Sequence, residues 1–236
     1  MTPERIARLR DVLDKRQPDL TVLTDFVHKQ RNLSAIVRNC DAVGIQTLHA
    51  VIGDEDYKSF RGTAMGSHSW VDVERHREPL AVIDSLKSSG YQMLAAHLDD
   101  NSVDYRDMDY TRPTALLLGA ERRGVSEVAL AQVDHCITIP MVGMVESYNV
   151  AVAAGIVLAE AQRQRAAAGM YDDRRLDLRT WTRLFFEWGH PAVRDYCKAR
   201  GLAYPPLNEE GEIDNPSRWY ASVRGGTAPL EDQGHD

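Results

Sequence analysis

Residues 114–126 read TALLLGAERRGVS, the most informative stretch for the class of fold. The apolar run at 115–118 is typical of a central strand covered on both faces, and a similar run lies at 137–139. A glycine-containing loop and a serine that can cap a helix follow the first run. The order of a strand, then a loop, then the beginning of a helix indicates an α/β protein with a mostly parallel sheet.

On either side of this stretch, short β-rich runs alternate with helical patterns. We expect strands at 20–27, 48–53, 70–76, 91–98, 114–119 and 136–140. We expect helices between them at 33–43, 57–66, 80–89, 126–133 and 149–167, and further helices near the N-terminus and at 176–187 and 191–200. This alternation favours a parallel sheet with additional helices at both ends of the chain.

The composition, 236 residues with a net charge of −7, is that of a soluble protein. Cys40, Cys136 and Cys197 lie far apart, without a CxxC pair or histidines at zinc spacing. We therefore expect neither a disulfide framework nor a metal site. The N-terminal residues lack the apolar stretch of a signal peptide, and no segment reaches the roughly 20 apolar residues of a membrane span. These features predict a cytoplasmic protein.

Charge is unevenly distributed along the chain. Residues 1–40 contain eight Lys and Arg against five Asp and Glu, whereas residues 203–236 contain two against seven. The acidic end also contains Pro and Gly, so we expect it to be solvated. The basic end is a candidate RNA surface, because its cations project beside the apolar stripe of the first helix. The alternative is a docking helix with a solvated basic edge.

Two loops that follow strands could hold a ligand, because open α/β sheets bind ligands beyond the carboxyl ends of their strands. The first, 119–124, has the Gly-x-x-x-x-Gly spacing of a phosphate loop, but Val125 stands where that loop needs lysine. We therefore reject an NTPase, and a dehydrogenase lacks its Gly-x-Gly-x-x-Gly fingerprint. The second loop, 139–149, leads into a helix that begins with small residues and suits tight packing or a subunit interface. Ser147 and Asn149 are either helix-capping residues or functional groups.

A third segment, residues 28–44, has the pattern of an amphipathic helix that ends at Gly44. Arg38 falls on its polar face with Ser34 and Asp41. By position alone, Arg38 is either a solvated charge paired with a neighbour such as Asp41 or a functional group.

Together these segments resemble the TrmH branch of the SPOUT superfamily, the tRNA guanosine 2′-O-methyltransferases. The resemblance extends over residues 3–172 and is carried by the strings RQPDLTV at 16–22, NLSAIVR at 32–38, DYTRPT at 109–114 and EAQRQR at 160–165. It implies an α/β methyltransferase domain at 20–168 with a C-terminal trefoil knot. A basic helical extension at 1–19 would contact RNA, and a helical extension with an acidic tail would occupy 169–236.

The resemblance also implies the residues of a site. The catalytic set is Asn32, Arg38, Glu121, Ser147 and Asn149. The cofactor-binding set is Ala96, Gly119, Ile139 and Tyr148. The RNA-binding set is Arg5, Arg8, Lys15, Arg16, Lys29 and Arg31. The sequence departs from the family pattern at Ala96 (usually Thr), Tyr148 (usually Leu), Glu146 (usually Gln) and Gln30-Arg31 (usually Pro-His), and none of these changes removes a catalytic group.

The implied activity is S-adenosylmethionine-dependent 2′-O-methylation of a guanosine ribose in tRNA, with guanosine 18 of the D-loop as the expected target, by a homodimer. A guanidinium is almost always protonated and is a poor base. Our hypothesis is therefore that Arg38 holds an RNA phosphate and stabilises the developing alkoxide, while phosphate or water takes the proton. The alternatives are an rRNA 2′-O-methyltransferase of the same superfamily and an RNA-binding protein without catalysis.

Overall fold

The computed structural model describes residues 1–52 and 69–231, so the helix expected at 57–66 lies outside the described residues. The chain forms two compact units. One contains Arg16–Arg175, and the other contains Met1–Lys15 together with the chain from Leu176 onward. Among the described residues, no helix has the length and apolar character needed to cross a bilayer.

The larger unit is built on a seven-stranded sheet in the order β3-β2-β1-β6-β4-β7-β5. Every neighbouring pair of strands is parallel, which confirms the predicted sheet. The strands are β1 (Leu20–Asp25), β2 (Thr47–Val51), β3 (Asp72–His76), β4 (Gln92–Ala96), β5 (Val103–Asp104), β6 (Thr114–Gly119) and β7 (His135–Thr138). The short β5, which a single turn of 3-10 helix follows at Tyr105–Asp107, was not predicted, since two residues are too few for a recognisable pattern.

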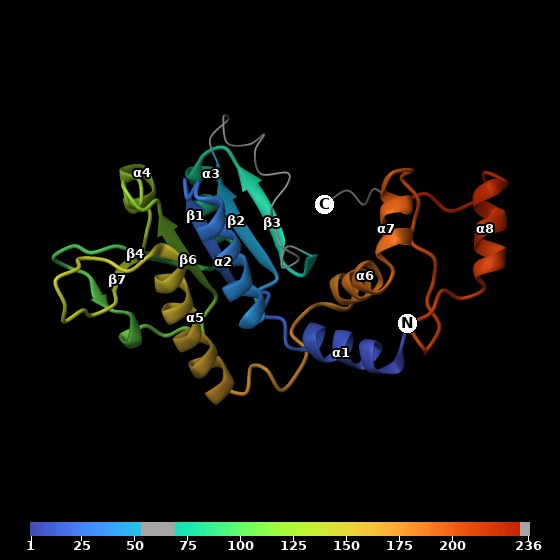
Figure 1. Ribbon diagram of the computed structural model, residues 1–236, viewed down its shortest axis with the longest axis horizontal. Helices are drawn as coiled ribbons and strands as arrows, with labels where there is room; N and C mark the ends of the chain where they lie inside the picture. The colour runs from blue at the N-terminus through green and yellow to red at the C-terminus, as the bar shows by residue number, and fades with distance from the viewer. Residues whose placement is uncertain (53–68, 232–236) are drawn as a thin grey trace. The chain divides into compact units, whose positions relative to one another are not determined.

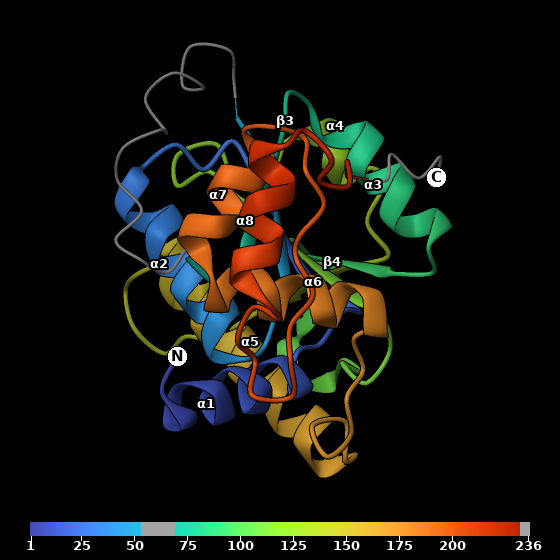
Figure 2. The same ribbon diagram turned by 90° about the vertical axis from the view of Figure 1, so that its right-hand side faces the viewer.

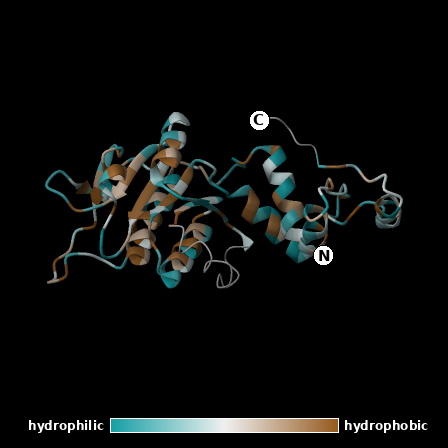
Figure 3. Cartoon of the chain, turned by 90° about the horizontal axis from the view of Figure 1, so that it is seen from above, coloured by the Kyte–Doolittle hydropathy of each residue, from teal (hydrophilic) through white to brown (hydrophobic). Residues whose placement is uncertain are grey.

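Helices cover both faces of this sheet (Figure 1). α2 (Gln30–Ala42) and α5 (Val150–Ala167) contribute to one apolar core, and α3 (Pro79–Ser88) and α4 (Glu127–Leu130) contribute to the other. The central strands β1 and β6 are buried over nearly their whole length, as their apolar runs predict. Figure 3 shows brown, hydrophobic segments in the interior of the sheet and its helices. The trefoil knot implied by the resemblance stays a prediction.

The small residues at the start of α5 allow it to approach α2 closely. A methyl group added at Gly155 would lie 3.3 Å from the side-chain nitrogen of Asn39. That nitrogen donates a hydrogen bond to the main-chain oxygen of Ala151 at 2.8 Å. The expectation of tight packing is therefore confirmed within the chain itself.

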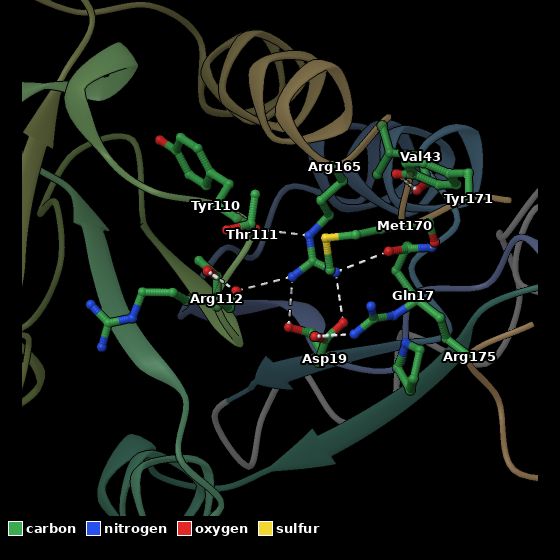
Figure 4. A network of polar contacts seen from close by, with 12 residues as sticks. Gln17, Asp19, Val43, Tyr110, Thr111, Arg112, Arg165, Met170, Tyr171 and Arg175 are labelled. Atoms are coloured by element: carbon green, nitrogen blue, oxygen red, sulfur yellow. Dashed lines mark hydrogen bonds and ion pairs between the residues drawn. The ribbon is translucent and has the colours of Figure 1, made fainter. Parts of the chain in front are cut away.

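A buried arginine fixes the carboxyl-terminal part of α5 to the amino ends of the central strands (Figure 4). Arg165 is fully buried and donates to the carboxylate of Asp19 at 2.6 Å and to the side-chain oxygen of Gln17 at 3.0 Å. It also donates to the main-chain oxygens of Asp19, Tyr110 and Arg112, at 3.1, 2.9 and 3.1 Å. One side chain thus ties three distant segments together at the end of the sheet opposite the carboxyl ends of the strands.

The smaller unit is helical and contains α1 (Pro3–Asp14), α6 (Leu178–Gly189), α7 (Pro191–Lys198) and α8 (Pro216–Arg224) (Figure 2). Most of α8 is exposed, as expected of a solvated tail, but one residue of this helix is buried. Asn215 caps this helix by accepting a hydrogen bond from the main-chain nitrogen of Arg218, and Pro216 occupies its first turn. Trp219 is 7% exposed and meets Tyr196 of α7 edge to face. Burial of this indole outweighs the acidic composition around it.

Candidate functional site

A cavity of about 480 Å³ lies beyond the carboxyl ends of the neighbouring strands β6, β4 and β7. This is the position where parallel α/β sheets bind ligands. All four residues predicted to bind a cofactor, Ala96, Gly119, Ile139 and Tyr148, line it. Other residues that line the cavity were not predicted, and they include His97, Leu118, Ile137, Met141 and Val157. Apart from His97, these residues are apolar, and apolar side chains that line a cavity cannot be told from core residues in a single sequence.

The loop at 119–126 forms one wall of this cavity and depends on two glycines. A methyl group on Gly119 would lie 2.1 Å from the carbonyl carbon of Gly124 and 2.2 Å from the nitrogen of Val125, so only glycine fits. Gly124 has a φ of +68°, in the left-handed region that glycine adopts without strain. Its N–H donates to the main-chain oxygen of Ala120 at 2.8 Å and closes the turn.

Asp25, which the sequence analysis did not single out, fixes the far end of this loop. It ends β1 beside Gly119, is 1% exposed, and accepts a hydrogen bond from the main-chain nitrogen of Ser126 at 2.7 Å. Ser126 occupies the N-cap position of α4, but its side chain makes no capping hydrogen bond. A buried carboxylate on the neighbouring strand, rather than the predicted serine cap, therefore holds the loop.

Three of the predicted catalytic residues form one hydrogen-bonded cluster at the cavity. The Asn32 amide donates to the Glu121 carboxylate, and the Asn149 amide donates to the side-chain oxygen of Asn32 at 3.2 Å. Asn149 also caps α5 by accepting from the nitrogen of Ala151 at 3.0 Å. Lys29 adds an ion pair to Glu121 at 3.5 Å. The cluster joins the start of α2, the first loop and the start of α5.

The charge of Glu121 is maintained by these neighbours. Burial raises the pKa of its carboxyl group, but its own main-chain N–H, the Lys29 ammonium and the Asn32 amide lower it, and the net shift is downward. Glu121 is therefore ionised at neutral pH and acts as an acceptor that orients Asn32. It is not poised to take up a proton.

The other two predicted catalytic residues lie apart from this cluster. Ser147 is exposed and lines the cavity, but it does not cap α5. Arg38 is exposed on α2 and does not line the cavity. The interpretation that pairs Arg38 with Asp41 is not supported, because Asp41 accepts a 2.7 Å hydrogen bond from Arg16 instead.

The predicted RNA-binding cations divide into one buried residue and five exposed ones. Arg16 is fully buried and also donates to the main-chain oxygens of Ile45 and Trp70, at 2.8 and 3.0 Å. Its assignment to RNA is therefore wrong, because no part of the side chain reaches the surface. The exposed cations are Arg5, Arg8 and Lys15 in the smaller unit and Lys29 and Arg31 in the larger unit. Arg8 and Lys15 share Asp11 as an ion-pair partner.

The sheet is parallel throughout, and two loops and a polar cluster enclose a small-molecule cavity at its carboxyl edge. These features define the class of protein as an α/β enzyme that binds a cofactor. Residues 19–159 match the SpoU rRNA methylase family, and residues 163–216 match its C-terminal region. The chain belongs to the SpoU rRNA methylase family. The resemblance to the TrmH branch is thereby confirmed.

Individual relatives agree with this assignment. The tRNA (guanosine(18)-2′-O)-methyltransferase of Escherichia coli strain K12 is 46% identical over 226 residues, which cover 95% of this chain and 99% of the relative. The enzyme of the same name from Thermus thermophilus is 49% identical, covering 79% of this chain and 96% of the relative. The crystal structure of the A. aeolicus TrmH/SpoU tRNA modifying enzyme superposes with a TM-score of 0.73 at 41% identity, covering 80% of this chain and 97% of that one. The crystal structure of AviRb from Streptomyces viridochromogenes in complex with AdoMet superposes with a TM-score of 0.55 at 30% identity. The match covers 65% of this chain and 62% of that one.

Proposed function

We propose that this protein transfers a methyl group from S-adenosylmethionine to the ribose 2′-hydroxyl of guanosine 18 in tRNA. The observation that carries this proposal is the 46% identity to a tRNA (guanosine(18)-2′-O)-methyltransferase over 95% of the chain. The cavity and the Asn32, Glu121 and Asn149 cluster supply the corresponding site. The family's name refers to rRNA, but the substrate in the names of the Escherichia coli and Thermus thermophilus relatives is tRNA.

The residues present fit S-adenosylmethionine. The cavity has a volume of about 480 Å³, within the usual range for small-molecule sites. Leu118, Ile137 and Ile139 offer an apolar surface for a purine, and Ala96 and Tyr148 stand at its border. When bound, S-adenosylmethionine supplies an electrophilic methyl group on a sulfonium.

The protein's own residues have to orient the RNA and manage one proton. We infer that Arg38 holds an RNA phosphate and stabilises the developing alkoxide, because its guanidinium is exposed and permanently charged. The proton then passes to phosphate or water. Asn32 does not itself line the cavity, but its hydrogen bonds link Glu121 and Asn149, which do. The cluster thereby fixes the part of the cavity wall that positions the substrate. Ser147 borders the same cavity and contributes a hydroxyl.

Gly119→Ala is expected to weaken S-adenosylmethionine binding. The added methyl would overlap the backbone at Gly124 and Val125, so the loop that walls the cavity has to change its shape. Overpacking of this kind costs roughly 1–3 kcal/mol. At 1.4 kcal/mol for each tenfold change, the dissociation constant rises by about 5- to 150-fold. Calorimetric titration measures it.

Gly143→Ala is the matched control in the second loop. A methyl group at Gly143 meets no atom within 4 Å. The affinity of this variant for S-adenosylmethionine should therefore equal that of the unmodified protein. Equal affinities of both variants and the unmodified protein would show that the close approach at Gly119 does not shape the cofactor site.

We further propose that the exposed cations Arg5, Arg8, Lys15, Lys29 and Arg31 bind tRNA phosphates. Arg31 and Arg38 are seven residues apart on α2 and therefore share one helix face. Five phosphate contacts predict that the dissociation constant for tRNA rises roughly 10²- to 10³-fold between 50 and 200 mM salt. Filter binding measures this dependence, and S-adenosylmethionine affinity should stay nearly constant as an internal control. A flat salt response of tRNA binding would contradict the assignment.

The homodimer and the cytoplasmic location remain parts of the proposal. Apolar side chains are exposed around the cavity, which is unusual for a surface that stays in water. They are Leu98, Val142, Met144, Val145 and Val152, at 64%, 107%, 100%, 66% and 48% exposure. A second copy that covers this surface would close the site, and light scattering of the purified protein tests that arrangement.

Methylation of defined RNAs tests the function itself. We expect the purified protein with labelled S-adenosylmethionine to methylate a tRNA transcript once, and to leave unmodified the same transcript carrying 2′-deoxyguanosine at position 18. An rRNA fragment serves as the substrate for the alternative enzyme. Exclusive methylation of rRNA would favour that enzyme, and RNA binding without any methylation would favour a non-catalytic protein.

A further inference from the structure

Two histidines and a glutamate converge on neighbouring strands away from the methyltransferase site. In the parallel pairing of β2 and β3, His49 lies opposite Glu74, and His76 is two residues further along β3. Because side chains alternate along a strand, all three project from the same face of the sheet. The Nδ1 atom of His49 lies 3.1 Å from Nε2 of His76 and 3.2 Å from Oε2 of Glu74.

From this geometry we propose that His49, Glu74 and His76 form a binding site for a divalent transition-metal ion of the zinc type. Imidazole nitrogens and a carboxylate oxygen are ligands that zinc takes, and two histidines with one glutamate form a known three-ligand set. Two ligand atoms bound about 2.0–2.1 Å from a tetrahedral zinc lie roughly 3.3 Å from each other. The two measured separations are close to this value.

The third separation, between the carboxylate of Glu74 and Nε2 of His76, requires only a small adjustment. The three ligating atoms all lie within 4.8 Å of one another, so the carboxylate of Glu74 needs at most a small movement toward His76. Glu74 has a side chain that is 56% exposed, against 13% for His49, and it has room to rotate. The two histidines are half-buried and provide the fixed side of the site. With three protein ligands, water would supply the fourth ligand of a tetrahedral ion.

The location assigns the ion a structural role. β3 is the edge strand of the sheet, and none of its five residues is fully buried. Few apolar contacts therefore hold it, and its attachment depends on the hydrogen bonds to β2. A metal bound by one ligand from β2 and two from β3 would link these strands. None of the three ligands lines the methyltransferase cavity, so the site goes beyond the proposed function.

Zinc titration of the full-length, chelator-stripped protein tests the proposal. We expect one zinc ion per chain to bind saturably in competition with a chromophoric chelator. Glu74→Gln should weaken binding at least about tenfold, and the double variant His49→Asn/His76→Asn should abolish it at this site. His135→Asn, which removes an exposed histidine on β7, is the matched control and should leave binding unchanged.

Two further measurements distinguish a metal site from a simple hydrogen bond between the imidazoles. Cobalt(II) should produce visible absorption bands of a four- or five-coordinate ion that disappear in Glu74→Gln, a substitution at an exposed side chain that leaves the core intact. Zinc at about 100 times its dissociation constant should raise Tm by roughly 5–10 °C in the unmodified protein and in His135→Asn, but not in the double-histidine variant.

Absence of stoichiometric zinc binding would overturn the proposal. Binding that survives in both Glu74→Gln and the double-histidine variant would also overturn it, because thiols or other histidines would then hold the ion. Methylation of tRNA should persist after metal removal, so failure of this inference is distinguishable from failure of the proposed function.

Discussion

Arg38→Ala should lower the rate of methyl transfer by roughly 10²- to 10³-fold, the usual loss when one charge-stabilising donor is removed from an active site. Arg38 is exposed on α2 and does not line the cofactor cavity. We therefore expect the dissociation constant for S-adenosylmethionine to be nearly unchanged. Single-turnover methylation and calorimetry on the same preparation separate these two quantities.

Two comparison variants sharpen this test. Arg38→Lys retains the charge but loses the planar pair of donors, so it should recover only part of the rate. Arg112→Ala removes an exposed arginine just before β6, at the end of the sheet opposite the cavity, and its side chain points away from Arg165 (Figure 4). That variant should retain full activity. Full turnover of Arg38→Ala would exclude the assigned role, and parallel loss of cofactor binding would indicate a structural one.

Arg165→Met should destabilise the protein by about 3–5 kcal/mol, the cost of removing one partner from a buried, hydrogen-bonded ion pair. Arg165 is fully buried, and its loss removes five hydrogen bonds, which go to Gln17, Asp19, Tyr110 and Arg112. Asp19 retains an ion pair with Arg175 at 2.6 Å, and this pair limits the loss of folding stability. At roughly 2–4 °C per kcal/mol, Tm should fall by about 6–20 °C.

Arg163→Ala provides the control on the same helix. Arg163 has a side chain that is 67% exposed and pairs with Glu160 one turn away, and exposed ion pairs of this kind add little to stability because water screens them. In thermal and urea unfolding, the stability of Arg163→Ala should be close to that of the unmodified protein. If Arg165→Met were equally stable, the buried network would not be the structural link that its hydrogen bonds indicate.

This network explains much of the family resemblance in physical terms. Three of the four strings that carry the resemblance, at 16–22, 109–114 and 160–165, supply the groups that meet around Arg165. They therefore identify the fold through a structural feature distant from the cavity. The fourth string, at 32–38, contains Asn32 and Arg38 and belongs to the site.

Local patterns were sufficient for the elements whose signals lie within a few residues. The apolar run of β6 and the asparagine cap of α5 were predicted with bounds close to those observed, because strand burial and helix capping act over one element. α8 was missed, because the acidic composition around Trp219 conceals a helix that is stabilised by packing against Tyr196.

The sequence by itself determined the parallel α/β class, the family and the two loops that wall the cavity, since these depend on periodicity, glycine positions and short strings. Only the tertiary structure decided which polar side chains meet. Arg16 donates hydrogen bonds to Asp41 and Ile45, which lie more than 20 residues away in the sequence, so its burial could not be predicted. Glu121 is 89 residues from Asn32, and His49 is 27 from His76. Hydrogen bonds and coordination act over a few ångströms in space, so partners distant in the chain leave no local pattern.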